Sequence, residues 1–396
     1  LDMGMYTTVK NNLKNNKATG PMGVQNEIIK HLPEEFHELL YTLMAQMWTH
    51  RHVPLSWKKG YFCFHHKKGD VTNQKNYRPI ALLDGLFKFY TAVLARMLAD
   101  FCEINGILAE AQEGSRTKRN TLRQLTRITN AIEDANVSKQ ELHALYVDFE
   151  NAYGSVDHTN LLHTMTHLGV PEQLVEAVGD ILGTTDSTAM QMRAKVGVHE
   201  SAEVPIRRGL LQGDSMSPLL FIIYLEPLLR WLEVGEHGYK HRHATDEDQK
   251  GPLRTATGAF VDDLILLTPT SAHMVDQIDK LKRFEGWSGL KINPGKSAIT
   301  GILQGQNRVP EKEHEKIRKL LRTKEKSSTQ LAILQPNDTY KYLGLRITMT
   351  GRWDEEKRET LKAIEHRIQA LIACPLRPEQ KEYSLKTAIL GKYRYG

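Results

Sequence analysis

Cysteine is scarce in this chain. The 396 residues include 3 cysteines, Cys63, Cys102 and Cys374, which stand far apart. Because no Cys-x-x-Cys pair is present, the sequence indicates neither a zinc knuckle nor a disulfide framework. This cysteine usage is typical of a protein in a reducing compartment.

Long apolar runs are also missing. The longest one covers residues 218–232, and Glu226, Pro227 and Arg230 interrupt it. A helix that crosses a membrane needs about 20 largely apolar residues. We therefore expect a buried helix that ends near Glu226, and no membrane partner.

Charge of one sign is only in mild excess. The formal net charge is +6 and the sequence pI is about 9.0. Such a balance permits a nucleic-acid partner without establishing one. The length allows two or three subdomains. Because the chain opens on Leu1 rather than Met, we expect a segment of a longer protein, with any targeting signal outside it.

Hydrophobic spacing predicts a mixture of helices and strands. Helices are expected over residues 36–47, 86–97, 274–287 and 356–374, and strands over residues 61–64, 142–149 and 340–347. A basic turn is expected at residues 65–70, and a β-hairpin at residues 258–267 with two acids in its turn.

Two charged stretches, residues 236–253 and 310–328, are predicted to be surface insertions. The first contains His237, His241 and His243. These histidines could bind a metal ion, but without neighbouring cysteines a polar surface loop is the favoured interpretation.

Three aspartates have the pattern of a metal site. Asp148 ends the predicted strand at residues 142–149, and Asp262 and Asp263 lie in the predicted hairpin turn. Joining nucleotides needs a nucleophilic 3′-hydroxyl and a stabilised pyrophosphate, and two divalent ions about 3.5–4 Å apart provide both. Such ions prefer carboxylate oxygens. The alternative is structural, because aspartate is also a common turn residue.

Further motifs follow one another in a recognisable order. They are residues 15–24 (NNKATGPMGV), 57–58 (WK), 67–70 (KKGD), 77–83 (YRPIALL), 112–116 (QEGSR), 148–153 (DFENAY), 208–218 (RGLLQGDSMSP), 260–263 (FVDD), 289–296 (GLKINPGK) and 342–344 (YLG). Together they resemble the reverse transcriptase domain of non-LTR (LINE-type) retrotransposons, and the resemblance covers nearly the whole chain.

The resemblance implies a right-hand polymerase: an α/β (α+β) chain with fingers, palm and thumb and an antiparallel palm sheet flanked by helices. The fingers with an N-terminal extension would cover residues 1–140. The palm would cover residues 141–338, with part of the fingers near residues 160–205. The primer grip and the start of the thumb would follow at residues 339–396.

It also implies a set of metal ligands. Asp148 and Asp262 would bridge two Mg²⁺ ions, with Mn²⁺ as an alternative. Asp263 would be a weaker ligand or an electrostatic helper, and the backbone carbonyl of Phe149 would complete one coordination sphere.

Other residues would contact the substrates. The predicted dNTP-binding residues are Lys67, Lys68, Arg78, Tyr153, Gln212 and Lys296. Arginine offers phosphate a bidentate fork and lysine a point charge. The ring of Tyr153 would exclude a 2′-hydroxyl, and Lys296 would lie near the leaving pyrophosphate.

The glycines beside Gln212 would permit close backbone approach to the substrates. Tyr342, Leu343 and Gly344 would form the primer grip. Basic residues of the last helix would follow the duplex backbone, namely Lys357, Arg358, Lys362 and Arg367. For each basic or aromatic residue taken singly, a solvated surface or core position is the competing interpretation.

The chain departs from the family pattern at several positions. Met22 stands in place of an acid, Asn151 in place of a lysine, and Gly154 in place of another acid. Val261 replaces the usual alanine. Phe260 favours the non-LTR group over intron and retroviral enzymes, which mostly have tyrosine there.

The predicted function is RNA-directed DNA polymerisation with an RNA template, a DNA or RNA primer and dNTPs, in target-primed reverse transcription in the nucleus. No endonuclease is visible in this segment, and the sequence does not determine the oligomeric state. The alternatives are a group II intron-like or domesticated reverse transcriptase, or a catalytically silent nucleic-acid-binding scaffold with the same fold.

Overall fold

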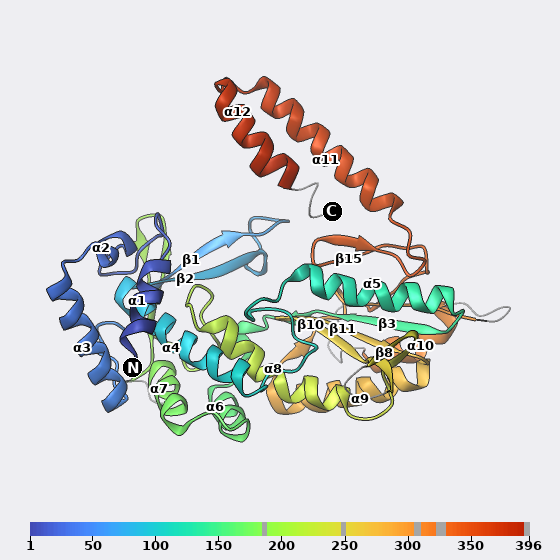
Figure 1. Ribbon diagram of the computed structural model, residues 1–396, viewed down its shortest axis with the longest axis horizontal. Coiled ribbons are helices and arrows are strands. Elements are labelled where there is room, and N and C mark those ends of the chain that lie inside the picture. The colour runs from blue at the N-terminus through green and yellow to red at the C-terminus, as the bar shows by residue number, and fades with distance from the viewer. Residues whose placement is uncertain (184–187, 247–250, 305–309, 322–329, 392–396) are drawn as a thin grey trace. The chain divides into compact units, whose positions relative to one another are not determined.

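The computed structural model describes residues 1–183, 188–246, 251–304, 310–321 and 330–391 (Figure 1). The chain divides into two compact units. Unit 1 contains Leu1–Arg119, Phe149–Trp231 and Lys280–Lys291, and unit 2 contains Asn120–Asp148, Leu232–Asp279 and Ile292–Gly396. The fingers, palm and thumb boundaries given above follow a different division and stay a prediction.

The sheet of unit 1 is built around two long strands. β1 (Lys59–His66) pairs antiparallel with β2 (Tyr77–Leu83) and parallel with β5 (Gln191–Val196). Two short strands, β6 (His199–Glu200) and β7 (Val204–Pro205), extend β5. The structure therefore has the strand expected at residues 61–64. The basic turn expected at residues 65–70 begins only after His66, because His65 and His66 continue β1.

Helices make up most of the rest of unit 1. They are α1 (Met3–Asn12), α2 (Asn26–Lys30), α3 (Glu34–His50), α4 (Gly85–Ile104), α6 (His158–His167), α7 (Glu172–Leu182) and most of α8 (Ser217–Glu233). Two 3₁₀ turns, η1 (Gln74–Asn76) and η2 (Tyr153–Ser155), complete it.

The predicted end of the apolar helix near Glu226 is wrong. α8 continues through Pro227 to Glu233. Proline removes one hydrogen bond to the preceding turn, and its ring crowds the carbonyl four residues earlier. Residues on both sides of it, including Leu225 and Leu228, are fully buried, so packing outweighs the lost bond. Among the described residues, no helix is long and apolar enough to cross a membrane.

The sheet of unit 2 has the strand order β10 (Thr257–Phe260), β11 (Asp263–Thr268), β3 (Leu142–Val147), β13 (Ala298–Ile302) and β14 (Ala332–Ile333). All its pairs are antiparallel except the last. Every residue of β3 is buried, which explains its continuous apolar sequence.

α5 (Thr121–Val137) covers this sheet, as Figure 1 shows. The side chain of Asn120 caps its first turn by accepting the N–H of Arg123. One face of α5 buries Leu125, Ile128 and Ile132 in a core that also contains residues of β3 and β11. This apolar face is the main reason that α5 lies on the sheet. An α/β chain with an antiparallel sheet flanked by helices is therefore confirmed.

Unit 2 corrects two sequence predictions, the loop at residues 236–253 and the single strand at residues 340–347, and gives the second charged stretch a helix. The stretch at residues 236–253 is not a loop, because β8 (Tyr239–Asp246) and β9 (Gly251–Thr255) form a hairpin there. Residues 310–320 form α10 (Pro310–Leu320), which buries His314 and Ile317, while residues 322–329 lie outside the described residues. The strand expected at residues 340–347 is a tight hairpin of β15 (Tyr340–Tyr342) and β16 (Leu345–Ile347).

The remaining elements have the following bounds: β4 (Phe149–Glu150), α9 (Ser271–Ser288), β12 (Lys291–Ile292), α11 (Asp354–Ala373), α12 (Pro378–Ser384) and a π-helical turn, Leu385–Ile389. The buried carboxylate of Glu356 in α11 accepts the backbone N–H of Arg346 at 2.9 Å and so attaches the helix to β16.

Candidate active site

Two neighbouring strands of unit 2 bring the predicted metal ligands to one end of the sheet. Asp148 directly follows β3, Asp262 lies in the turn between β10 and β11, and Asp263 begins β11. Leu264 pairs with Val147, so the next position of this antiparallel register sets Asp263 opposite Asp148. The predicted hairpin is therefore present, with Asp262 in its turn and Asp263 at the first position of β11.

The electrostatics show that the three carboxylates are close. The pKa of Asp263 is raised to about 6, first by desolvation, then by the charge of Asp262, then by that of Asp148. Asp263 is exposed as a residue. Like charges that cannot all be hydrated disfavour ionisation of the group between them.

Lys296 lies beside the first of these acids. Its Nζ is 3.4 Å from Asp148 Oδ2, and its side chain is 65% exposed. Asp148 Oδ2 is buried and accepts no hydrogen bond within the described part of the chain. An ammonium group thus partly balances a carboxylate oxygen whose lone pairs are otherwise available.

Two residues that the sequence analysis did not single out fix the backbone of Asp148. Its N–H donates to Ser297 Oγ at 3.1 Å, and its carbonyl accepts the N–H of Asn293 at 2.8 Å. Ser297 Oγ in turn donates to the carbonyl of Asn293 at 2.8 Å. Both lie in or next to the motif at residues 289–296, which was the available signal.

Tyr340 is a third residue that the sequence analysis missed. Its ring stacks on that of Tyr146 with centroids 4.0 Å apart, and its hydroxyl donates to the carbonyl of Lys296 at 3.0 Å. Burial, followed by the charges of Asp148 and Asp263, raises its pKa to about 12. Tyr340 is therefore a neutral hydroxyl beside the acids.

The described residues include no group of three or more His, Cys, Asp and Glu side chains arranged to hold a metal ion as they stand. His241 is buried and its Nε2 contacts Thr255 Oγ1 at 3.0 Å. The favoured polar surface loop is thus wrong for this residue, because the hairpin turns it into the core. The side chain of His243 lies outside the described residues.

The predicted phosphate-binding cations belong to unit 1. Lys67 and Lys68 follow β1, and Arg78 lies on β2 opposite His65. All three are exposed. The hairpin therefore gathers these positive charges at one solvent-facing tip.

The loop that carries Gln212 is fastened to the same strand. The carbonyl of Gln212 accepts the N–H of Ala81 at 2.7 Å. Gly213 has φ +130°, and a Cβ there would lie 2.3 Å from the carbonyl oxygen of Ala81. Only glycine permits this approach. Strand β2 thus links the Gln212 loop to Arg78 within unit 1.

Tyr153 lies in η2, and its ring stacks on Phe221 of α8 with centroids 5.0 Å apart and planes 6° apart. Its carbonyl accepts the N–H of Leu210 at 2.8 Å. A Cβ on Gly209, which has φ +87°, would lie 2.8 Å from Gly154 Cα. The two motifs therefore pack backbone against backbone.

This packing explains a departure from the family pattern. A Cβ at Gly154 would lie 2.4 Å from the side-chain nitrogen of Asn151. Asn151 itself has φ +45°, a conformation that asparagine tolerates better than lysine. The two unusual residues are thus structurally coupled.

The predicted primer-grip residues form the turn between β15 and β16. Leu343 has φ +48° and Gly344 φ +91°. The side chain of Tyr342 is buried. Any contact of this turn with a primer therefore has to come from the backbone or from residues other than the Tyr342 ring.

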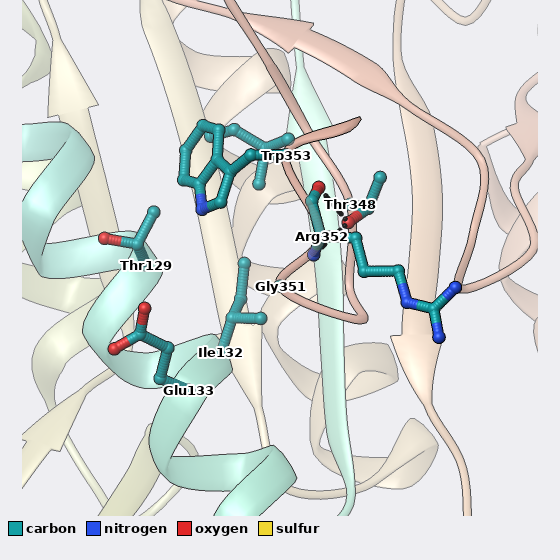
Figure 2. A pocket seen from close by; sticks show the side chains of 8 residues that line it. Thr129, Ile132, Glu133, Thr348, Gly351, Arg352 and Trp353 are labelled. Carbon is teal, nitrogen blue, oxygen red and sulfur yellow. Dashed lines mark hydrogen bonds between the residues drawn. The ribbon is translucent and has the colours of Figure 1, made fainter. Parts of the chain in front are cut away.

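A short loop leads from this hairpin to α11 and closes against α5. Figure 2 shows the hollow between them, lined by residues that include Thr129, Ile132 and Trp353. Thr348 Oγ1 accepts the N–H of Arg352 at 3.1 Å and donates to its carbonyl at 3.0 Å. None of the predicted site residues lines this hollow.

Comparison with known proteins identifies the class. The family described as reverse transcriptase (RNA-dependent DNA polymerase) matches residues 65–347. The chain belongs to this family of nucleotidyltransferases, which has the right-hand fold, uses an RNA template and depends on divalent metal ions.

Its relatives indicate the branch. The Pol polyprotein of a type-1 R2 element from Popillia japonica is 25% identical over 348 residues, covering 87% of this chain and 45% of the relative. The RNA-directed DNA polymerase of the mobile element jockey from Drosophila melanogaster is 24% identical over 290 residues, or 71% and 30% of the two chains. The reverse transcriptase family is therefore confirmed, and the relatives that the chain resembles are polymerases of retrotransposable and mobile elements.

This chain spans less than half the length of these relatives. Among solved structures, telomerase from Candida tropicalis is similar with a TM-score of 0.49 and 12% identity, covering 84% of this chain and 53% of that one.

Proposed function

We propose that this chain extends the 3′ end of a primer with dNTPs along an RNA template, using two Mg²⁺ ions held by Asp148, Asp262 and Asp263. The observation that carries the proposal is the strand register that sets Asp263, at the start of β11, opposite Asp148, at the end of β3. The raised pKa of Asp263, to which the charges of Asp262 and Asp148 contribute, agrees with this crowding. Acids that are packed so closely that they raise one another's pKa are typical of a functional site.

The three acids supply the type of ligand that a pair of hard divalent ions requires, although, in the residues that the structure describes, their side chains are not drawn together around an ion as they stand. Asp148 Oδ2 is buried without a hydrogen bond among the described residues, and three carboxylates supply oxygen ligands. Bound there, the ions would make the primer 3′-oxygen nucleophilic and stabilise the departing pyrophosphate. Asp148 and Asp262 would be the main ligands, with Asp263 and the carbonyl of Phe149 as the weaker ones.

Lys296 would act on the leaving group. Its ammonium lies 3.4 Å from Asp148 Oδ2 and is largely exposed, so it is free to turn toward a phosphate. A lysine in this position supports the proposal of proton donation to pyrophosphate.

The residues of unit 1 would hold the incoming nucleotide. Arg78, Lys67 and Lys68 offer an exposed positive tip to the triphosphate. The ring of Tyr153, held against Phe221, would exclude the 2′-hydroxyl of a ribonucleotide. Gln212 would hydrogen-bond the nucleotide or the template from a loop fixed to β2.

In the whole protein this reaction would serve target-primed reverse transcription in the nucleus. That setting needs an endonuclease and a nicked DNA end, and both belong to the longer protein. A catalytically silent scaffold is the alternative from another class. It has no use for three mutually repelling acids, so the geometry favours the enzyme.

Incorporation of dTTP on a poly(rA)/oligo(dT) template with Mg²⁺ tests the proposal. We expect extension that Asp262→Asn abolishes and that rUTP does not support. Extension that survives Asp262→Asn, or none from folded wild-type protein, would overturn the enzymatic proposal. Efficient use of rUTP would instead remove the role proposed for Tyr153.

A further inference from the structure

A buried hydrogen-bond chain lies behind the acidic turn of unit 2. Gln124 of α5 donates from Nε2 to the hydroxyl of Tyr342 in β15 at 3.1 Å. The Tyr342 hydroxyl in turn reaches the carbonyl oxygen of Asp263 at 3.5 Å. The contact with the Asp263 carbonyl is at the long limit of a hydrogen bond, so the bond from Gln124 is the shorter of the two. It fixes the position of the Tyr342 hydroxyl, which points toward that carbonyl.

This chain is set in an apolar environment. Gln124 is fully buried and Tyr342 is 3% exposed, among core residues that include Leu125, Ile128 and Tyr146. Gln124 Oε1 has no hydrogen-bond partner among the described residues. Burying an amide with an unmatched oxygen costs free energy that a leucine or methionine would not. Its presence therefore calls for a function that an apolar side chain cannot perform.

The opposite strand of the turn is shaped around the same amide. A Cβ on Gly258 of β10 would lie 2.1 Å from Gln124 Nε2. The amide nitrogen of Gln124 therefore occupies the space beside Gly258 Cα of β10 that a side chain would fill. Its partner, the Tyr342 hydroxyl, contacts the backbone carbonyl of Asp263 in β11. The two contacts hold both strands of the hairpin from behind.

The turn itself needs such support. Val261 has φ +59°, a conformation that β-branched residues rarely adopt. Backbone strain of this kind persists only where the surroundings impose it, at a cost of about 1–3 kcal/mol. Relaxation of this turn would move Asp262, the next residue.

We propose that Gln124 and Tyr342 are positioning residues that hold the strained Val261–Asp262 turn in place, and with it the carboxylate of Asp262 that is proposed to bind metal. The inference rests on the proposed function and gives it a second set of residues, remote from the substrates. It also assigns the buried ring of Tyr342 a role distinct from primer contact, which would fall to the rest of its turn.

Three variants and one control test the proposal: Tyr342→Phe, Gln124→Met, the double variant, and Tyr239→Phe. Tyr239 is a matched control because it is also fully buried in the same core and donates to a residue of α5, Asp134 Oδ2, at 2.7 Å. Primer extension is measured against Mg²⁺ concentration and dTTP concentration, together with hydrogen exchange at residues 257–266 in the metal-free, substrate-free protein.

For Tyr342→Phe and Gln124→Met we expect kcat to fall about three- to tenfold, the size expected from one buried hydrogen bond. The Mg²⁺ concentration for half-maximal rate should rise by a similar factor, with little change in the KM for dTTP. The double variant should lose no more than the worse single variant, because both break the same chain. Exchange at residues 257–266 should accelerate in these variants and not in Tyr239→Phe.

Equal effects of Tyr342→Phe and Tyr239→Phe on Mg²⁺ dependence and exchange would show that both hydroxyls merely stabilise the core, and would overturn the proposal. Independent, multiplicative losses in the double variant would also overturn it. The exchange measurement does not require activity. If the wild-type protein does not polymerise but residues 257–266 still exchange faster in the Tyr342→Phe and Gln124→Met variants, only the proposed function is rejected.

Discussion

The acids of unit 2 and the basic hairpin tip of unit 1 differ in how their backbones are held. Asp148 follows a strand with every residue buried, and hydrogen bonds from both sides fix its peptide groups. Lys67, Lys68 and Arg78 are exposed, at the tip of a two-stranded ribbon. Metal coordination tolerates little movement, whereas a charged triphosphate can be gripped by side chains that adapt. The difference predicts which substitutions affect rate and which affect binding.

The largest effect is expected at the acidic turn. Asp262→Asn removes one negative charge from the metal site while keeping the side chain's shape. We expect kcat to fall on the order of 10³-fold or more, because the proposed mechanism makes both ions depend on this ligand. Primer extension at saturating dTTP measures it. Asp338→Asn is the control, since Asp338 is an ordinary turn acid that accepts the N–H of Gln335 at 2.7 Å. A comparable loss in both variants would contradict a metal-ligand role.

A smaller effect of another kind is expected at the hairpin tip. Arg78→Ala removes a charged fork, and we expect the KM for dTTP to rise about 10- to 100-fold, with a smaller change in kcat. Arg78→Lys should recover only part of this loss, because lysine cannot bond two phosphate oxygens as a fork does. Lys319→Ala, at an exposed position of α10, serves as the control for lost positive charge. A pure loss of kcat in Arg78→Ala would erase the distinction between the two regions.

Much of this arrangement could be predicted from the sequence because it depends on local patterns. The apolar run at residues 142–147 predicts a buried strand, and Asp148 follows directly where that run ends. Apolar residues on both sides of Asp262 and Asp263 predict the hairpin. The order of the motifs supplied the family, and with it the function.

The rest depends on contacts between distant residues, which a sequence pattern does not reveal. Gln124 and Tyr342 are 218 residues apart, and neither charge nor periodicity connects them. The pairing of Asn151 with Gly154 is local, but it is visible only once the left-handed backbone at Asn151 is known. Leu343 and Gly344 broke the expected single strand for the same reason, since their positive φ angles make a turn.

A still smaller effect is expected at Lys296. This residue contacts the acidic site, yet its side chain is exposed like those of the basic hairpin tip. Lys296→Met removes a cation 3.4 Å from Asp148 Oδ2. The Mg²⁺ concentration for half-maximal rate should fall about two- to threefold, a modest change because water screens an exposed ammonium. If Lys296 donates a proton to pyrophosphate, kcat falls at the same time. Lys341→Met, at an exposed position of β15, is the control. A higher Mg²⁺ requirement in Lys296→Met would contradict the ion-pair argument.

The smallest effect concerns stability, and it tests whether the acidic site is strained before metal binds. The pKa of Asp263 in the folded chain, about 6, lies above its ordinary value of 3.8, so the folded state holds this proton more tightly than the unfolded state. Its contribution to stability is therefore complete below about pH 4 and is lost as the pH rises through 6.

Asp263→Asn should escape this loss, with a melting temperature about 1–2 °C above that of wild type at pH 7 without metal. The difference should shrink toward pH 4.5, and Mg²⁺ should stabilise wild type more than the variant, since the metal neutralises the repulsion that the variant lacks. Thermal unfolding at both pH values, with and without Mg²⁺, measures all of this. A pH-independent difference would mean that the Asp263 carboxyl titrates normally, and the contrast between a preorganised, self-repelling acidic site and an adaptable basic tip would then rest on backbone burial alone.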